Sequence, residues 1–154
     1  MELTLDQALQ KGIEAHKAGK VQEADRYYTA ILKAQPKHPD ANHNMGVLAV
    51  GVGKTQEALH FLKTALEENP KIEQFWLSYI DALIKLDRLD DAKTVFNQAK
   101  SNALNHDHLD RLEGRLKQLD EQPTPKRLEP ILKLYKEEKF QLVYFHKAQC
   151  LKDH

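Results

Sequence analysis

The feature of this sequence that most constrains its fold is a repeat of 34 residues. Three alanines are separated by that interval: Ala24, Ala58 and Ala92. Each is followed four residues later by a large side chain, in order Tyr28, Leu62 and Phe96. Two further pairs keep the same interval, Pro36 with Pro70 and Gly12 with Gly46. Several residue types that stay in phase at this period predict a solenoid of repeated supersecondary units.

Each unit has the pattern of two helices. Apolar residues recur at helical spacing in a first stretch, such as Leu5 to Ala18 or Asp40 to Val50. Second stretches with the same spacing cover about 21–34, 55–68 and 89–101. Thr4-Leu5-Asp6-Gln7 is a capping box that starts the first helix. Gly19 and Gly53 suit helix ends, and the prolines prevent continuation of the second helices. The sequence therefore predicts an all-α fold of at least six helices in antiparallel pairs, with no β-strand.

The repeated alanines and large side chains predict how the helices pack. Small residues such as Ala58 allow two helix backbones to approach closely, and the large residue one turn later fills the adjacent space. We therefore expect Ala58 to lie where the two helices of the middle unit cross.

At these residues the sequence resembles the tetratricopeptide repeat family. Trp76 occupies the position where the family has an aromatic residue, whereas Ala8 and Asn42 stand there in the other units. Gly12 and Gly46 match the family's small residue, and Ile80 departs from it. The resemblance implies an α-solenoid with three repeats at about 5–38, 39–72 and 73–104, within a region that spans 1–104.

The chain continues beyond the third repeat with a different pattern. Leucines recur on one side of a helix expected over about 107–120: Leu109, Leu112, Leu116 and Leu119. A helix with one apolar stripe suits the end of an array, so 105–121 is predicted as a capping helix. The two prolines at 123 and 125 predict a linker over 122–127. Residues 128–154 resemble a partial, degenerate fourth repeat in which Val143 replaces the small alanine.

Composition argues against several function classes. The chain has 23 basic and 23 acidic residues and a formal net charge of zero, whereas a nucleic-acid binder usually needs a basic excess. The same balance argues against binding to a membrane surface, and the apolar run Val47 to Val50 is far below the roughly 20 residues that span a bilayer. With the single cysteine Cys150 and no signal-peptide pattern, the sequence predicts a cytoplasmic protein.

We find no catalytic or metal-binding motif. Asn105-His106-Asp107-His108 brings two histidines together but has no third ligand at defined spacing, and Asn105 or Asp107 suits a helix N-cap better. No serine or cysteine nucleophile accompanies His43. The glycines before Lys54 and Thr55 lack phosphate-loop spacing. The sequence therefore predicts a protein that is not an enzyme and needs no metal or cofactor.

The family resemblance implies that the first helices line a concave groove for another polypeptide. Carried over by register, the positions that face this groove include the polar residues Asp6, His16 and Asp40. The partner-binding residues predicted in this groove are Leu9, Ile13, His43, Asn44, Val47, Val50, Gln74, Leu77, Asp81 and Ile84. An apolar floor with a few polar side chains suits a peptide or an amphipathic helix of a partner. Filling of the groove by the chain's own C-terminal helix, and self-association, stay open as alternatives.

One subset of the family grips acidic chaperone tails with cationic side chains and asparagines. Of those positions only Asn44 matches here. The others hold Leu9, Ile13, Gln74 and Ser78, so a carboxylate would be desolvated without a cation. Chaperone-tail binding is therefore not expected. The second function that stays open is a truncated N-terminal repeat arm of a larger enzyme, of glycosyltransferase or sulfotransferase type, that recognises substrate or mediates oligomerisation.

Overall fold

The part of the chain that the structure describes is built from helices. A computed structural model describes residues 2–102, 105–122, 128–130, 132–134 and 136–137. These residues contain no β-strand. The helices within 2–122 are α1 Leu5–Lys17, α2 Val21–Ala34, α3 Pro39–Gly51, α4 Thr55–Glu68, α5 Glu73–Lys85, α6 Leu89–Lys100 and α7 His106–Glu121. The predicted all-α fold is confirmed, and the helix bounds agree with the sequence prediction to within about two residues, the usual ambiguity of helix ends.

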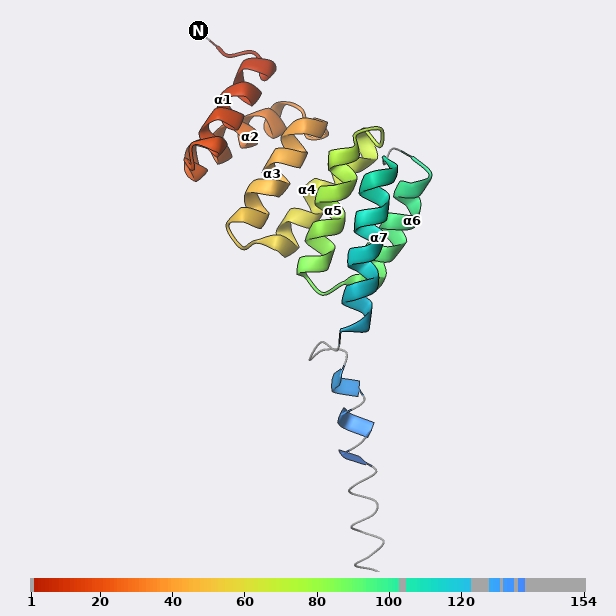
Figure 1. Ribbon diagram of the computed structural model, residues 1–154. Helices are drawn as coiled ribbons and strands as arrows, with labels where there is room; N and C mark the ends of the chain where they lie inside the picture. The colour runs from red at the N-terminus through yellow and green to blue at the C-terminus, as the bar shows by residue number, and fades with distance from the viewer. Residues whose placement is uncertain (1, 103–104, 123–127, 131, 135, 138–154) are drawn as a thin grey trace, which may run out of the picture. The chain divides into compact units, whose positions relative to one another are not determined.

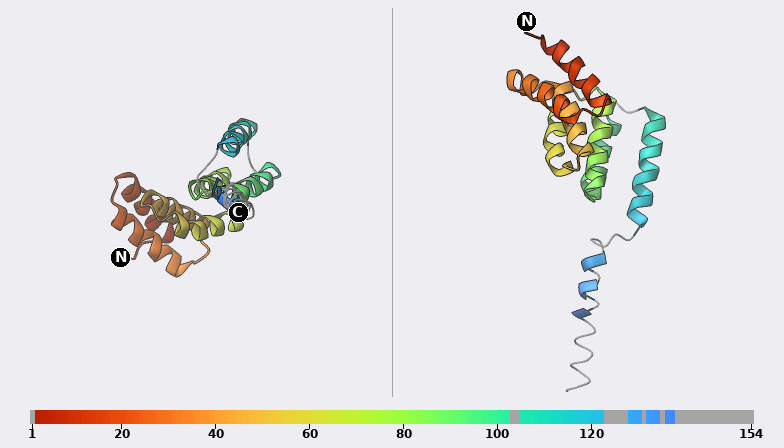
Figure 2. Two further views of the ribbon diagram at one scale, coloured as in Figure 1. Left: turned by 90° about the horizontal axis from the view of Figure 1, so that it is seen from below. Right: turned by 90° about the vertical axis from the view of Figure 1, so that its left-hand side faces the viewer.

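The first six helices form three antiparallel pairs. Helix α1 packs against α2, α3 against α4, and α5 against α6, and neighbouring pairs meet through α2 with α3 and α4 with α5. Two further views show the pairs stacked in succession (Figure 2). The first helices α1, α3 and α5 run in the same direction (Figure 1). Their first turns therefore lie along one edge of the stack, and their last turns lie along the other.

The turn inside each pair has the same geometry. Gly19 and Gly53 have φ values of 73° and 82°, and the equivalent residue of the third pair, Asp87, has φ 55°. This left-handed region costs glycine little, and aspartate is among the few other residues that enter it. Each second helix then begins with a basic residue paired to an acidic residue three positions later: Lys20 with Glu23, Lys54 with Glu57, and Arg88 with Asp91.

The two helices of a pair cross at small residues. The three repeated alanines are fully buried: Ala24, Ala58 and Ala92. A Cβ atom added at Gly12 would lie 2.6 Å from the Tyr28 ring, and one at Gly46 would lie 2.6 Å from Leu62. Contacts that short do not occur between real side chains, so these glycines are needed for packing rather than for backbone conformation. The predicted position of Ala58 is confirmed.

The loop before α5 and the loop before α3 are each tied to the following helix by a side-chain hydrogen bond, although the donor residue differs. The indole N–H of Trp76 donates to the carbonyl of Pro70 at 2.8 Å. At the equivalent position of the preceding pair, Nδ2 of Asn42 donates to the carbonyl of Pro36 at 3.0 Å and to that of His38 at 2.9 Å. Asn42 is 2% exposed, so these bonds satisfy a buried amide. Asn42 departs from the aromatic pattern but keeps the bond that ties the loop to the helix.

The chain divides into two compact units, residues 1–116 and 117–154. Most of α7 belongs to the first unit, where Leu112 and Leu116 are buried. In the second unit, residues 128–130, 132–134 and 136–137 are helical. The predicted linker beyond residue 122, Val143, Cys150 and the rest of the predicted fourth repeat lie outside the described residues.

Candidate functional site

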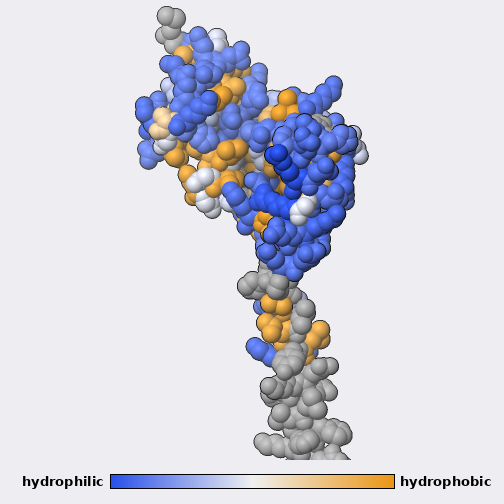
Figure 3. Space-filling view, viewed as in Figure 1, coloured by the Kyte–Doolittle hydropathy of each residue, from blue (hydrophilic) through white to orange (hydrophobic). Residues whose placement is uncertain are grey.

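The exposed surface of α1, α3 and α5, which we term the first-helix face, carries a row of apolar side chains. All of them are half-buried: Leu9, Ile13, Val47, Val50, Leu77 and Ile84. Within each helix they are separated by three, four or seven residues, so they share one side of the helix. Figure 3 shows apolar surface along α3 and the adjoining part of α1. The predicted apolar positions therefore lie together, and each keeps surface that a partner could cover.

A polar cluster lies between α3 and α5 on this face. The His43 ring stacks on Phe75 with 4.8 Å between ring centroids, and its Nε2 is 2.9 Å from Oγ of Ser78. Gln74 donates from Nε2 to the same Ser78 oxygen at 3.2 Å. Burial lowers the pKa of His43, although its neighbours Asn44 and Asp40 act in the opposite direction. His43 thus joins two repeats through Ser78 and Phe75, while Gln74 contacts the same oxygen from within α5; the sequence did not indicate either use.

Asp81 also has a partner within the chain. Its carboxylate accepts a hydrogen bond from Nη1 of Arg115 in α7 at 2.5 Å. At the start of the same helix, Glu73 accepts from the His108 ring at 2.8 Å and from the Asn105 backbone N–H at 3.0 Å. The His108 bond, followed by that from Asn105, holds the pKa of Glu73 below its ordinary value. Among the predicted polar residues, Asn44 is half-buried and forms a side-chain hydrogen bond with His43.

The two edges of the first-helix face carry opposite charges. Acidic side chains stand in the first turns, Asp6 in α1 and Asp40 in α3. Basic side chains stand in the last turns, Lys17 in α1 and Lys85 in α5. This arrangement stabilises the helix dipoles. It also leaves the apolar row between an acidic edge and a basic edge.

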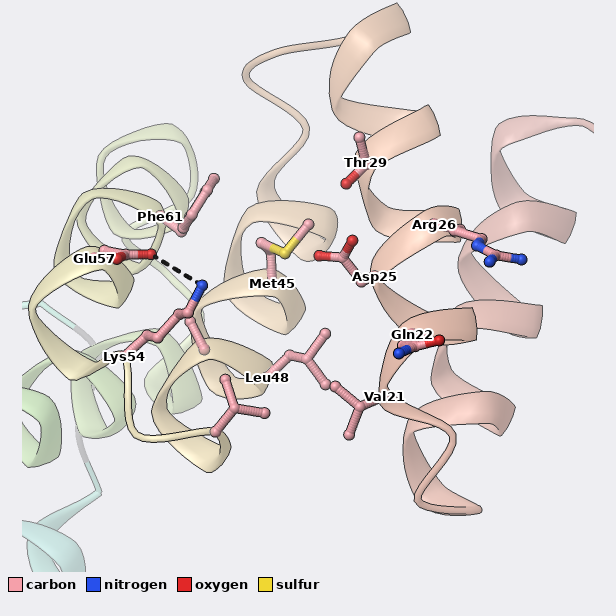
Figure 4. Close-up of a pocket in the computed structure, with 12 residues that line it drawn as sticks. Val21, Gln22, Asp25, Arg26, Thr29, Met45, Leu48, Lys54, Glu57 and Phe61 are labelled. Atoms are coloured by element: carbon pink, nitrogen blue, oxygen red, sulfur yellow. Dashed lines mark ion pairs between the residues drawn. The ribbon is translucent and has the colours of Figure 1, made fainter.

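The sequence analysis missed a pocket on the opposite side of α3. It has a volume of about 570 Å³ and lies between α2, α3 and α4. Figure 4 shows Met45 and Leu48 between the two second helices, with Phe61 on the α4 side and Asp25 on the α2 side. The pocket residues of α3 are about half a turn of the helix away from Val47 and Val50. A position-by-position comparison of the repeats could have shown that Asp25 and Ala49 stand where the next repeat has the larger Leu59 and Leu83.

The predicted His-Asp-His motif is a helix start. The Asn105 side chain accepts a hydrogen bond from the backbone N–H of Asp107 at 3.1 Å, which is the expected capping contact. Across the part of the chain that the structure describes, no three metal-ligating side chains come together. In the same residues no helix is long and apolar enough to cross a membrane.

Comparison with known proteins agrees with this geometry. A tetratricopeptide repeat family model matches residues 49–116. No curated protein sequence matches the chain. Pseudomonas aeruginosa PilF is similar in structure, with a TM-score of 0.64 and 16% identity over 77% of this chain, which spans only 54% of that chain.

Two similar structures contain a peptide or chaperone partner. The first repeat domain of Spaghetti (RPAP3), bound to the HSP90 peptide SRMEEVD, gives a TM-score of 0.60 and 22% identity over 71% of this chain and 93% of that one. The TPR2B domain of yeast Sti1, in its pHsp70 complex, gives a TM-score of 0.66 and 18% identity. That match covers 74% of this chain and 96% of the Sti1 domain. Identities this low establish a common fold only.

Proposed function

Because the chain is a tetratricopeptide repeat protein, we propose that it is a non-catalytic interaction module that holds a segment of another polypeptide on its first-helix face. The row of half-buried apolar side chains on α1, α3 and α5 carries this proposal. Burying a medium apolar side chain contributes roughly 1.5–3 kcal/mol, and a few central residues usually dominate an interface. Val47 and Leu77 are central in the row, and Asn44 beside them can both donate to and accept from a peptide backbone.

The proposed segment is not an acidic tail. The peptide SRMEEVD that binds Spaghetti (RPAP3) carries three acidic side chains. Here Leu9, Ile13 and Gln74 offer no cation to such a ligand, and burial of an unpaired carboxylate is strongly unfavourable. The apolar row favours an amphipathic helix or an apolar peptide instead.

The test is capture of a partner by the purified chain, identified by mass spectrometry. The variant Asn44→Ala with Leu77→Asp is expected to lose the captured protein, because it removes a backbone-binding amide and places a charge in the apolar row. Helix content and melting temperature are expected to stay close to wild type, since both side chains are only half-buried. A matched control is Gln56→Ala, which changes an exposed side chain of α4 outside the first-helix face and is expected to retain the partner.

A double variant that captures its partner at wild-type affinity would rule out this face. If residues 121–154 cover the face themselves, the same variant is instead expected to melt earlier and to become protease-sensitive in that segment. These two results are distinct, so one preparation separates partner binding from self-filling.

The organisation of the chain after the third repeat is also a prediction. We infer that α7 closes the C-terminal end of the three repeats, because Leu112 and Leu116 are buried and its side chains His108 and Arg115 pair with Glu73 and Asp81 of α5. Cytoplasmic placement, and the alternative role as an arm of a larger enzyme, stay predictions from the sequence.

A further inference from the structure

The residues that line the pocket between α2, α3 and α4 differ from those at the next junction. Adding 34 to each residue number gives the equivalent place between α4, α5 and α6. There Asp25 is replaced by Leu59 and Ala49 by Leu83, both of which are buried. Met45 and Val52 likewise correspond to the larger Tyr79 and Leu86, whereas Leu48 and Phe61 correspond to the smaller Ala82 and Val95. At the second junction the buried side chains of Leu59 and Leu83 occupy space, whereas the first junction leaves a pocket of about 570 Å³.

The inside of this pocket is apolar. Leu48 and Met45 form its floor, and Phe61 stands on one wall. Its mouth leaves apolar surface uncovered, because Val21 is 40% exposed and Val52 is 47% exposed. The volume lies within the roughly 300–1,000 Å³ typical of binding sites. Large exposed side chains beside a concave apolar surface are the pattern expected where another molecule binds.

Some of the charged side chains around the pocket are already paired, and others are not. Lys54 and Glu57 on α4 are paired with each other at 3.9 Å. Arg26 is directed away from Met45 and Leu48 in Figure 4, whereas Asp25 is directed toward them. No hydrogen bond or ion pair joins the Asp25 side chain to another of the described residues. The pocket therefore presents an apolar floor beside the Asp25 carboxylate, while the guanidinium of Arg26, another lining residue, points away from that floor.

We propose that this pocket is a second binding site, independent of the first-helix face, for a partner segment that carries a large apolar side chain next to a lysine or arginine. The apolar side chain fills the space that Leu59 and Leu83 fill at the next junction. The neighbouring cation pairs with Asp25. The Asp25 carboxylate favours a cation over an anion at this position. Burial of the apolar side chain against the floor provides the larger part of the binding free energy.

Two small probes that share an indole ring test this proposal. Tryptamine carries a cation beside the ring, and indole-3-propionate carries an anion. Each is titrated into the full-length chain while amide shifts are followed by NMR. We expect both to shift amides of Leu48, Ala49 and Val52 in the millimolar range, with tryptamine bound roughly three- to tenfold more tightly because an exposed ion pair contributes little. The variant Asp25→Asn is expected to remove that difference.

A pocket-filling variant completes the test. Asp25→Leu with Ala49→Leu and Val52→Leu installs three residues of the second junction, and it is expected to abolish binding of both probes without lowering the melting temperature. Equal binding of the two probes to the wild type, absence of shifts at the pocket, or retention of binding by the filled variant would each overturn the proposal. If the pocket is only a water-filled gap between the second helices, neither probe is expected to shift the amides that line it. None of these outcomes depends on partner capture by the first-helix face.

Discussion

Two glycines separated by a single residue have opposite roles. Gly53 adopts φ 82°, whereas Gly51 ends α3 in open space with no atom near an added Cβ. We expect Gly53→Ala to lower the free energy of unfolding by about 1–2 kcal/mol, because an L side chain is strained in the left-handed region. Gly51→Ala is expected to raise it by up to about 1 kcal/mol, because alanine loses less chain entropy. Urea unfolding of both variants checks this pair, and equal effects would contradict it.

Tyr28 is a fully buried residue whose hydroxyl has no hydrogen-bond partner among the described residues. Burial raises the pKa of this phenol, since the ionised form would be desolvated. The third repeat has Phe96 at the equivalent position. We therefore expect Tyr28→Phe to leave the free energy of unfolding unchanged or to raise it by up to about 1 kcal/mol. A loss larger than that would mean that the hydroxyl is hydrogen-bonded in solution.

At the scale of single helices, the link between α5 and α7 depends on Glu73. The depressed pKa of Glu73 means that its contribution to the link is fully present above the ordinary value of 4.5 and is lost as pH falls through the lower, folded-state value. We expect hydrogen exchange of α7 amides to accelerate in acid relative to Glu73→Gln at the same pH. The variant should show a weaker link at neutral pH and a flatter response to acid. An identical acid response of the two proteins would mean that another group controls the contact.

The helices themselves were predictable because their signals are local. Periodic apolar residues, the Thr4 capping box and the turn glycines each act within a few residues, so their positions could be read without knowledge of the fold. Contacts between repeats were not predictable in this way. The bonds from His43 to Ser78 and from Arg115 to Asp81 join residues about one repeat apart, and nothing in the local pattern of either partner indicates the other. The pocket was missed for the same reason, because it results from side chains of three helices together.

At the scale of the whole array, position in the stack should decide how far a defect spreads. The middle pair contacts two neighbours, whereas the first pair contacts one. Trp76 is the single tryptophan and lies in the third pair, so its fluorescence reports that pair separately from total helix content. Ala58→Leu should overpack the middle crossing by roughly 1–3 kcal/mol and shift the melting of both signals together.

The matched variant Ala24→Leu places the same defect in the first pair. We expect its circular dichroism to show early loss of α1 and α2 while the Trp76 midpoint stays near that of wild type. Equal shifts of both signals in the two variants would mean that the three pairs unfold as one cooperative block.

The parallel direction of α1, α3 and α5 has a consequence for how a partner arrives. With a formal net charge of zero, the chain exerts no long-range attraction on a charged molecule. Asp6 and Asp40 along one edge and Lys17 and Lys85 along the other nevertheless form a lateral field across the apolar row. Such a field acts within about 8–10 Å at physiological ionic strength. It would turn an incoming helix about its own axis during the last stage of encounter, so salt should change the fraction of collisions that are productive more than the lifetime of the complex.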